Sequence, residues 1–385
     1  MPSPAPIALA ERQTRLAALR TLMDAAGVQA VLLGATASLR YFTGLVWHAS
    51  ERLCGAIVHL DGRLEYVCPA FEREKVAGIV GVPGEIITWE EHENPYALVA
   101  DRLGPAGRLA VDDQIALFMF LGLRKVLGDE RLADAGPLIH RLRRSKSPAE
   151  IALMQRAKAI TIEVHRRAWA SLTPGVRASE VTRYIDQQHR ALNGGTGSSF
   201  CIVSFGEDTA LPHGGETDRA LAPGDMVLID TGTTLDGYNS DITRSYVFGE
   251  ATPRVRRIWD IEKEAQAAAF AAATLGRPCE NVDDAARAVL VRHGLGPDYK
   301  LPGTPHRTGH GIGLDIHESP NLVRGDATPL EVGMCFSNEP MIVVPGAFGV
   351  RLEDHFHMTA DGPAWFTKPQ FSLDDPFGDV GHFEP

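Results

Sequence analysis

The segment PGDMVLIDTGTTLDGYNSD, residues 223–241, combines strand-like runs with glycine turns and carboxylates. Asp230 closes the apolar run MVLI and follows Gly224 by six residues. Asp241 follows Gly237 by four residues. An ionised carboxylate at the end of a buried strand costs on the order of several kcal/mol unless it is paired or bound to a metal. The segment therefore predicts a hairpin that carries two functional acids.

A second part of the chain repeats these offsets. In EVGMCFSNE, Glu339 follows Gly333 by six residues, and in GVRLE, Glu353 follows Gly349 by four. Each half reads glycine, strand, acid, turn, glycine, strand, acid. Glycines and acids are frequent, so coincidence is the alternative. We expect two copies of one hairpin, related by a pseudo-twofold axis, that direct four carboxylates at a common centre.

Four carboxylates at one point repel one another, and divalent cations relieve that repulsion. Such a set suits two metal ions about 3.5–4 Å apart that share bridging carboxylates. Oxygen-rich ligands favour Mn²⁺, Co²⁺ or Fe²⁺ over a thiolate zinc site. None of the five cysteines stands in a ligand-like spacing, which argues against a structural zinc ion.

The stretch HRTGHGIGLDIHESP, residues 306–320, contains three histidines among glycines. Each glycine costs about 1 kcal/mol inside a helix, so a zinc-binding HExxH helix is a poor interpretation. An irregular glycine-rich stretch instead allows the backbone to approach a crowded centre. We expect His310 to be a metal ligand, and His306 and His317 to contact substrate or support the ligands. Ordinary turn or core histidines are the alternative.

Other motifs carry less information. His213 lies beside a proline and two glycines in ALPHGGE and could be a simple loop histidine. TGHGIG has GxGxxG-like spacing, but no apolar strand precedes it, so dinucleotide binding is weakly indicated. No GxSxG occurs, which disfavours a serine hydrolase.

The composition excludes several classes of protein. The 385 residues carry a formal net charge of −11, which argues against nucleic acid or an anionic membrane as the main partner. We see neither a signal peptide nor an apolar run near the roughly 20 residues that span a bilayer. The cysteines are odd in number, five, and scattered along the chain, which favours reduced thiols and a cytoplasmic location.

The chain divides into two predicted domains. Residues 1–146 alternate short helices and strands, including a hairpin signal at Asp61-Gly62, and indicate an α/β domain. Ser147, followed by Pro148 and Glu150, predicts a capping box that opens a long helix and the second domain, residues 147–385. An ordinary loop within one domain is the alternative. The second domain has helices expected at 149–171, 178–192, 253–275 and 281–293, a turn at NGGTGSSF (193–200), and strands at 226–231, 241–248, 334–339 and 350–358.

The strings IDTGTTLDGYNSDITR, HRTGHGIGLDIHESP, NEP and GVRLED resemble the creatinase/methionine-aminopeptidase family in order and spacing. The resemblance covers residues 147–385 strongly and implies a pita-bread catalytic domain. ASLRYFTGL lies in a first domain that more weakly resembles the creatinase-type N-terminal domain. The implied fold class is α/β (α+β), with the layout of the Xaa-Pro dipeptidase (prolidase) and aminopeptidase P branch.

The resemblance also implies the metal ligands. Asp230 and Asp241 match ligands, with Asp241 bridging. His310 and Glu339 complete one site, and Glu353 matches the second bridge. All five ligand types are present, so the chain does not resemble creatinase, which works without metal. The implied cofactors are two divalent cations, Mn²⁺ above all, with Co²⁺, Fe²⁺ or Zn²⁺ as alternatives.

Substrate-handling residues follow in the same way. His213 and His317 match histidines that contact substrate and stabilise the tetrahedral intermediate. His306 and Arg351 match positions that line the pocket for proline or the substrate carboxylate. Glu339 matches a glutamate that handles the water proton.

The implied activity is hydrolysis of the Xaa-Pro amide bond in dipeptides or short peptides by a homodimer. An aminopeptidase acting on longer peptides, a non-peptidase hydrolase or lyase on this scaffold, and a binding module remain alternatives. Two departures from the family pattern, Asn338 and Met341, leave the ligands intact but could reshape the pocket.

Overall fold

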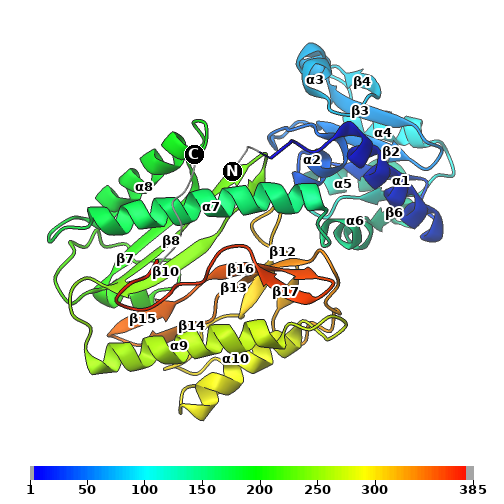
Figure 1. Cartoon of the computed structure of the whole chain (residues 1–385). Helices are drawn as coiled ribbons and strands as arrows, with labels where there is room; N and C mark the ends of the chain where they lie inside the picture. The colour runs from blue at the N-terminus through cyan, green and yellow to red at the C-terminus, as the bar shows by residue number, and fades with distance from the viewer. Residues whose placement is uncertain (1–3, 379–385) are drawn as a thin grey trace. The chain divides into compact units, whose positions relative to one another are not determined.

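The computed structural model describes residues 4–378, which form two compact units (Figure 1). One unit is Ile7–Arg143, and the other contains residues 144–378 together with residues 4–6. Among the described residues, none of the helices is both long and apolar enough to cross a bilayer.

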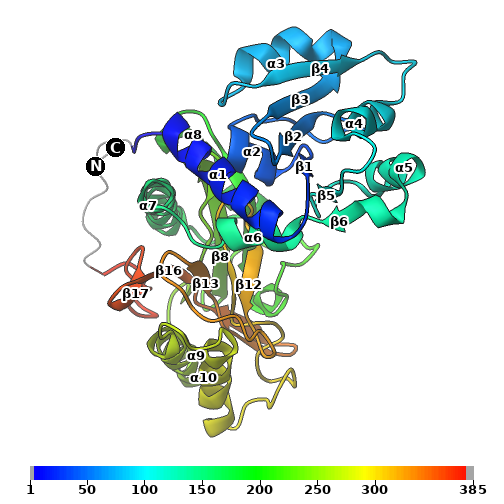
Figure 2. The ribbon, with the colours of Figure 1, turned by 90° about the vertical axis from the view of Figure 1, so that its right-hand side faces the viewer.

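The first unit is a six-stranded mixed sheet, with strand order β4-β3-β2-β1-β5-β6 and helices on both faces (Figure 2). The expected hairpin is confirmed, since β2 pairs with β3 antiparallel. The strands are β1 (Ala30–Leu33), β2 (Gly55–His59), β3 (Leu64–Pro69), β4 (Glu85–Trp89), β5 (Leu109–Val111) and β6 (Leu132–Asp134). The helices are α1 (Leu9–Ala25), α2 (Ala37–Thr43), α3 (Arg73–Ile79), α4 (Pro95–Leu103), α5 (Leu117–Leu127) and α6 (Gly136–Arg143).

The second unit places sheets between two pairs of helices (Figure 1). The helices are α7 (Pro148–Ser171), α8 (Ala178–Leu192), α9 (Pro253–Ala272) and α10 (Glu280–Arg292). The strands are β7 (Ser198–Phe205), β8 (Met226–Leu235), β9 (Tyr238–Asn239), β10 (Ile242–Val247), β11 (Gly309–Gly311), β12 (Glu318–Leu322), β13 (Cys335–Asn338), β14 (Met341–Val344), β15 (Phe348–Arg351), β16 (Asp354–Thr359) and β17 (Gly362–Trp365).

The long helix α7 begins as the sequence predicts. The Ser147 side chain accepts a hydrogen bond from the backbone N–H of Glu150, and the Glu150 carboxylate accepts one from the N–H of Ser147. These reciprocal bonds satisfy two of the unpaired donors at a helix start. Together with α8, this helix packs against β7, β8 and β10 through an apolar cluster that includes Ile160, Ile185 and Val227.

The second helix pair covers the other half of the unit. Helices α9 and α10 pack against β13–β16 through a larger cluster that includes Ala265, Val289 and Phe336. Each half therefore consists of a hairpin region under two helices. This arrangement matches the expected pseudo-twofold relation between the halves.

Two details differ from the sequence-based expectation. The strand expected at 350–358 is two strands, because Leu352 and Glu353 separate β15 from β16 and the two pair with different partners, β14 and β13. The turn expected at 193–200 is partly strand, since Ser198 opens β7. In both places pairing with a distant strand decides the conformation, and local composition does not reveal it.

Helix α9 also carries an unusual buried acid. Glu262 is fully buried, and no side chain among the described residues donates a hydrogen bond to its carboxylate. Burial raises the pKa of Glu262 well above its usual range. The folded protein therefore holds this carboxyl neutral at pH values where the unfolded chain ionises it.

Replacing Glu262 should stabilise the protein increasingly as the pH rises. A carboxyl with a raised folded pKa starts to destabilise the fold above its unfolded pKa, near 4.3. We expect Glu262→Met to gain more than about 1 kcal/mol at pH 8 and little at pH 4, measured by urea denaturation. The matched control is Glu264→Met, because Glu264 is half-exposed and pairs with Arg292 and His293. A pH-independent difference between wild type and Glu262→Met would contradict this account.

Candidate metal centre

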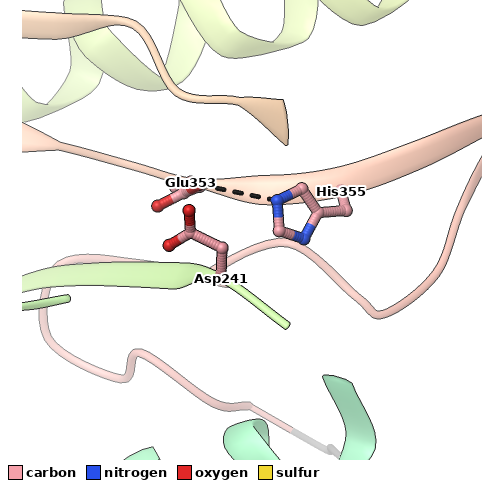
Figure 3. A group of neighbouring side chains, drawn as sticks. All are labelled: Asp241, Glu353 and His355. Carbon is pink, nitrogen blue, oxygen red and sulfur yellow. Dashed lines mark ion pairs between the residues drawn. The ribbon is translucent and has the colours of Figure 1, made fainter. Parts of the chain in front are cut away.

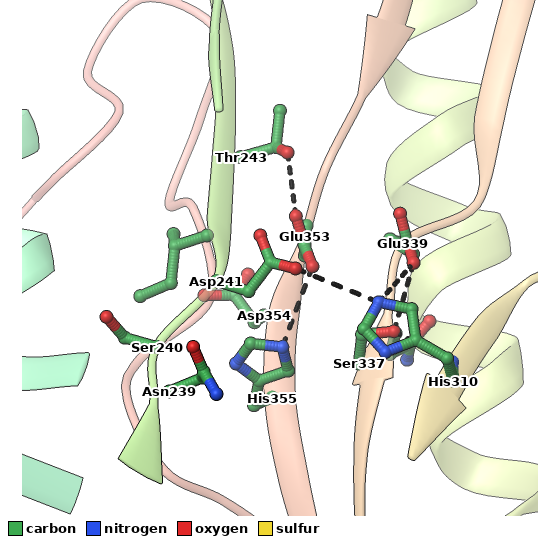
Figure 4. A network of polar contacts seen from close by, with 12 residues as sticks. Asn239, Ser240, Asp241, Thr243, His310, Ser337, Glu339, Glu353, Asp354 and His355 are labelled. Atoms are coloured by element: carbon green, nitrogen blue, oxygen red, sulfur yellow. Dashed lines mark hydrogen bonds and ion pairs between the residues drawn. The ribbon is translucent and has the colours of Figure 1, made fainter. Parts of the chain in front are cut away.

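Five expected ligands come from five separate places in the second unit. Asp230 lies within β8, Asp241 directly precedes β10, and His310 is the middle residue of β11. Glu339 directly follows β13, and Glu353 lies between β15 and β16. Four of them are buried, and the Glu339 side chain is 14% exposed. Figure 4 shows the side chains of Asp241, His310, Glu339 and Glu353 facing one another.

The side chains of four of these residues, Asp241, His310, Glu339 and Glu353, lie close to one another. His310 Nε2 is 3.0 Å from Glu339 Oε1 and 3.7 Å from Asp241 Oδ2. The ligand atoms of His310, Glu339 and Glu353 all lie within 4.8 Å of one another. Asp230 joins the group electrostatically, because its charge raises the pKa of both Asp241 and Glu353.

Glycines make this convergence possible. A Cβ atom on Gly309 would lie 2.1 Å from the carbonyl oxygen of Ser337, and one on Gly232 would lie 1.9 Å from that of Ser240. Both contacts are far below van der Waals distance, so any side chain would push the strands apart. The expectation that glycines serve close backbone approach is confirmed here.

Hydrogen bonds fix the orientation of His310. Its Nδ1 lies 3.0 Å from the carbonyl oxygen of Gly311, and a carbonyl only accepts, so Nδ1–H is the donor. The Nε2 atom then faces the carboxylates. Ser337 Oγ accepts the backbone N–H of His310 and donates to Glu339 Oε1, which ties both ligands to β13. A histidine held in this way is typical of metal ligands.

Burial and mutual repulsion disfavour the ionised forms of the acids at this centre. Burial, together with the neighbouring carboxylates, raises the pKa of Asp241 and of Glu353 well above the usual range. Burial likewise raises the pKa of Asp230, although Arg351 opposes that effect. Burial also disfavours the ionised form of Glu339, but the hydrogen bond from His310 and nearby positive groups outweigh it and lower the pKa.

At this centre, two buried carboxylate oxygens have no hydrogen-bond partner among the described residues, Asp230 Oδ1 and Glu353 Oε1. Burying a carboxylate oxygen without a partner destabilises the fold unless the oxygen coordinates a cation. Four carboxylates and one oriented imidazole match the donor types of Mn²⁺, Co²⁺, Fe²⁺ or Zn²⁺. The residues present therefore fit divalent cations.

Arg351 is bound to the same centre. Its Nη2 donates to Asp230 Oδ2 at 2.6 Å, its Nε to Thr243 Oγ1 at 3.1 Å, and its Nη1 to the carbonyl oxygen of Pro212 at 2.9 Å. Thr243 Oγ1 in turn donates to Glu353 Oε2 at 2.7 Å. Arg351 thus supports ligands from both halves of the site.

A cavity of about 750 Å³ opens onto the centre. All the histidines expected to handle substrate line it, as do apolar side chains such as Phe200 and Ile202. The complete lining is Phe200, Ile202, Pro212, His213, Asp230, Asp241, Tyr299, Pro305, His306, Arg307, His310, Ile316, His317, Val323, Glu339 and Arg351. The volume suits a small substrate.

The rings of His310 and His317 meet edge to face at 4.2 Å. Burial, with the nearby His310 and Arg307, lowers the pKa of His317 to about 4. His317 is therefore neutral at pH 7, and one of its nitrogens carries a proton that it can donate as a hydrogen bond.

Comparison with known proteins agrees with this centre. The model of metallopeptidase family M24 matches residues 152–360, and that of the creatinase/prolidase N-terminal domain matches residues 15–145. The chain belongs to metallopeptidase family M24. The predicted family, the pita-bread fold and the two-part layout are thereby confirmed.

Individual relatives of this M24 chain are similar along most of their length. A Xaa-Pro dipeptidase of Lactobacillus helveticus is 34% identical over 343 residues, which cover 87% of this chain and 92% of the relative. A crystal structure of dipeptidase PepE from Mycobacterium ulcerans superposes with a TM-score of 0.88 at 34% identity and covers 96% of this chain and 99% of the other. A prolidase structure from Thermococcus sibiricus gives a TM-score of 0.84 at 30% identity, with 93% and 97% covered.

Two residues near the M24 centre were not anticipated from the sequence. His355, on β16, groups with Asp241 and Glu353. Lys158, on α7, is fully buried, and its ammonium donates to the carbonyl oxygen of Asn239. For His355 a signal existed, because it stands two residues after Glu353 in a predicted strand and so shares its face. For Lys158 the helical pattern gives no such signal.

Divalent cations should raise the thermal stability of this M24 protein. A ligand at 100 times its Kd stabilises the folded state by about 2.7 kcal/mol. We expect chelation to lower Tm and Mn²⁺ to restore it, and Asp241→Asn to abolish the response while raising the Tm of the chelated protein, since one buried charge is removed. Differential scanning calorimetry measures both. Asp260→Asn, at an exposed position on α9, is the control and should respond as wild type. A full Mn²⁺ response in Asp241→Asn would contradict the ligand assignment.

Proposed function

We propose that the protein is a metal-dependent Xaa-Pro dipeptidase of the prolidase type, with two divalent cations in the active site. The observation that carries the proposal is the meeting of His310, Glu339, Glu353 and Asp241 at the base of a small cavity. The similarity to a Xaa-Pro dipeptidase over most of both chains supports the same activity.

The metal ligands in this proposal are Asp230, Asp241, His310, Glu339 and Glu353. Asp241 and Glu353 would be shared between the two cations, as in the family, and both have strongly raised pKa values because they are buried beside other carboxylates. When bound, the two cations activate a water molecule and polarise the scissile carbonyl. Manganese is our first choice for this oxygen-rich set, and cobalt, iron and zinc are the alternatives.

Side chains that line the cavity transfer the proton and stabilise the negative charge that develops on the substrate. Glu339 takes the proton of the attacking water and passes it to the leaving imino nitrogen of proline, since its carboxylate is ionised and lines the cavity. His317 is neutral and donates a hydrogen bond to the oxyanion, with His213 lining the same cavity as a second donor.

The free carboxylate of a dipeptide needs a positive partner. Arg351 lines the cavity, but its donors already hold Asp230, Thr243 and Pro212. Arg307 also lines the cavity, and no hydrogen bond or ion pair holds its guanidinium among the described residues. We therefore assign carboxylate binding to Arg307, and the walls of the proline pocket to His306 and Arg351.

Two further features belong to the proposal. The five cysteines are all free thiols, which suits the reducing cytoplasm. A homodimer is the expected assembly, as in the family that the sequence resembles.

A peptide-length series tests the dipeptidase activity. With Mn²⁺ or Co²⁺ added, we expect rapid cleavage of Ala-Pro and Met-Pro and at least about tenfold lower kcat/KM for Xaa-Pro-Yaa and longer peptides, measured by amino-acid release. Asp241→Ala and Glu353→Ala should lose activity and metal together. His317→Ala should keep its metal and lose about 100-fold in kcat, the loss typical of one oxyanion donor. Preferred cleavage of longer peptides would instead identify an aminopeptidase.

The carboxylate assignment has its own test. Arg307→Leu should raise KM for Ala-Pro by about tenfold or more, because a charge-assisted bond contributes about 1.5–3 kcal/mol. The prolinamide analogue, Ala-Pro-amide, is the matched control and should be cleaved equally by wild type and variant. Arg277→Leu, at a position outside the cavity lining, controls for loss of positive charge. Equal KM values for Ala-Pro in wild type and Arg307→Leu would remove the assignment.

A further inference from the structure

His355 has an environment that packing alone does not explain. The residue is fully buried in β16, and neither ring nitrogen has a hydrogen-bond partner among the described residues. Two other fully buried histidines of this unit do have partners: His165 Nε2 bonds the carbonyl oxygen of Ile242, and His189 Nδ1 bonds Ser198 Oγ. Burying an imidazole without a hydrogen-bond partner costs free energy, so a bound group that His355 could contact would stabilise this arrangement.

The strand geometry directs His355 at the metal centre. Successive side chains of a strand point to opposite faces, so His355 shares a face with Glu353. The intervening Asp354 points the other way, where it pairs with Arg244 and Gln266. Figure 3 shows the His355 ring beside the carboxylates of Glu353 and Asp241.

The distances fit a shared cation better than a direct bond. His355 Nε2 lies 3.6 Å from Glu353 Oε1, which is too long for a hydrogen bond, and Glu353 Oε1 has no hydrogen-bond partner either. Two ligands of one tetrahedral ion, each about 2.1 Å from it, lie about 3.4–3.5 Å apart. Asp241 contributes a third atom, and all three ligand atoms lie within 4.8 Å of one another.

Within residues 4–378, the buried positive side chains near His355 have other partners. Arg244 donates to Asp354 on the opposite face of the strand. The Nζ of Lys158 donates to the carbonyl oxygen of Asn239 at 3.0 Å and lies over the ring of Phe366. It is not within hydrogen-bond distance of His355.

We propose that His355 is a sixth metal ligand, which binds a cation together with Asp241 and Glu353. Both imidazoles, His310 from β11 and His355 from β16, then come from one five-stranded sheet. This inference rests on the proposed metal pair, but it concerns cation binding and not the choice of peptide.

Metal titration of the chelated apoprotein tests the proposal without substrate. We expect wild type to bind two Mn²⁺ per chain, and His355→Leu to bind one of them at least tenfold more weakly, measured by the EPR signal of free Mn²⁺. His357→Leu is the matched control: it lies on the same strand and face, beside Phe366, and should bind as wild type. Unchanged affinities in a folded His355→Leu protein would overturn the proposal.

A second measurement uses the wild-type chain, in case His355→Leu does not fold. In protein labelled with ¹⁵N-histidine, saturating Zn²⁺ should move ring nitrogens of two histidines to metal-bound shifts. One of these signals should be missing in His310→Ala, and the remaining one belongs to His355. A single metal-bound histidine in wild type would refute the sixth ligand. Failure to cleave Xaa-Pro peptides with two metal-bound histidines present would refute the proposed function and leave the metal ligand standing.

Discussion

The repulsion among buried carboxylates is the constraint on which the second unit depends. Asp230, Asp241, Glu339 and Glu353 come from both halves of the unit, and each is held where a charge is poorly solvated. Only part of their charge is offset within the chain, by Arg351 against Asp230. A fold that keeps such a group together has traded stability for cation binding.

This constraint explains why the strands around the site are built as they are. The interval between β13 and β14 places Glu339 opposite the interval that contains Glu353, since Asn338 pairs with Asp354 on one side and Met341 with Arg351 on the other. The ladder breaks where the acids stand. Carboxylates can therefore turn toward the centre, while the flanking pairs hold their backbones in place.

Sequence reasoning is most informative where the signal is local. The glycine-to-acid offsets singled out four acids, of which Asp241, Glu339 and Glu353 lie close to His310. The glycines around His310 predicted close backbone approach, because each feature is written within about ten residues. It could not foresee that Arg351 holds Asp230, or that β15 and β16 separate at Glu353. Those facts depend on the register between strands far apart in the chain, which no local pattern encodes. The alternation that places His355 beside Glu353 was readable from the strand predicted at 350–358.

Charge balance links the metal site to its substrate. The four carboxylates carry four negative charges, and Arg351 returns one positive charge to the centre. Two divalent cations then leave the site with one net positive charge, and Arg307 at the cavity wall adds another. A neutral imidazole such as His355 completes the coordination of a cation without changing this sum. The centre therefore favours small anionic ligands, which a dipeptide with a free carboxylate supplies and an internal segment of a long peptide does not.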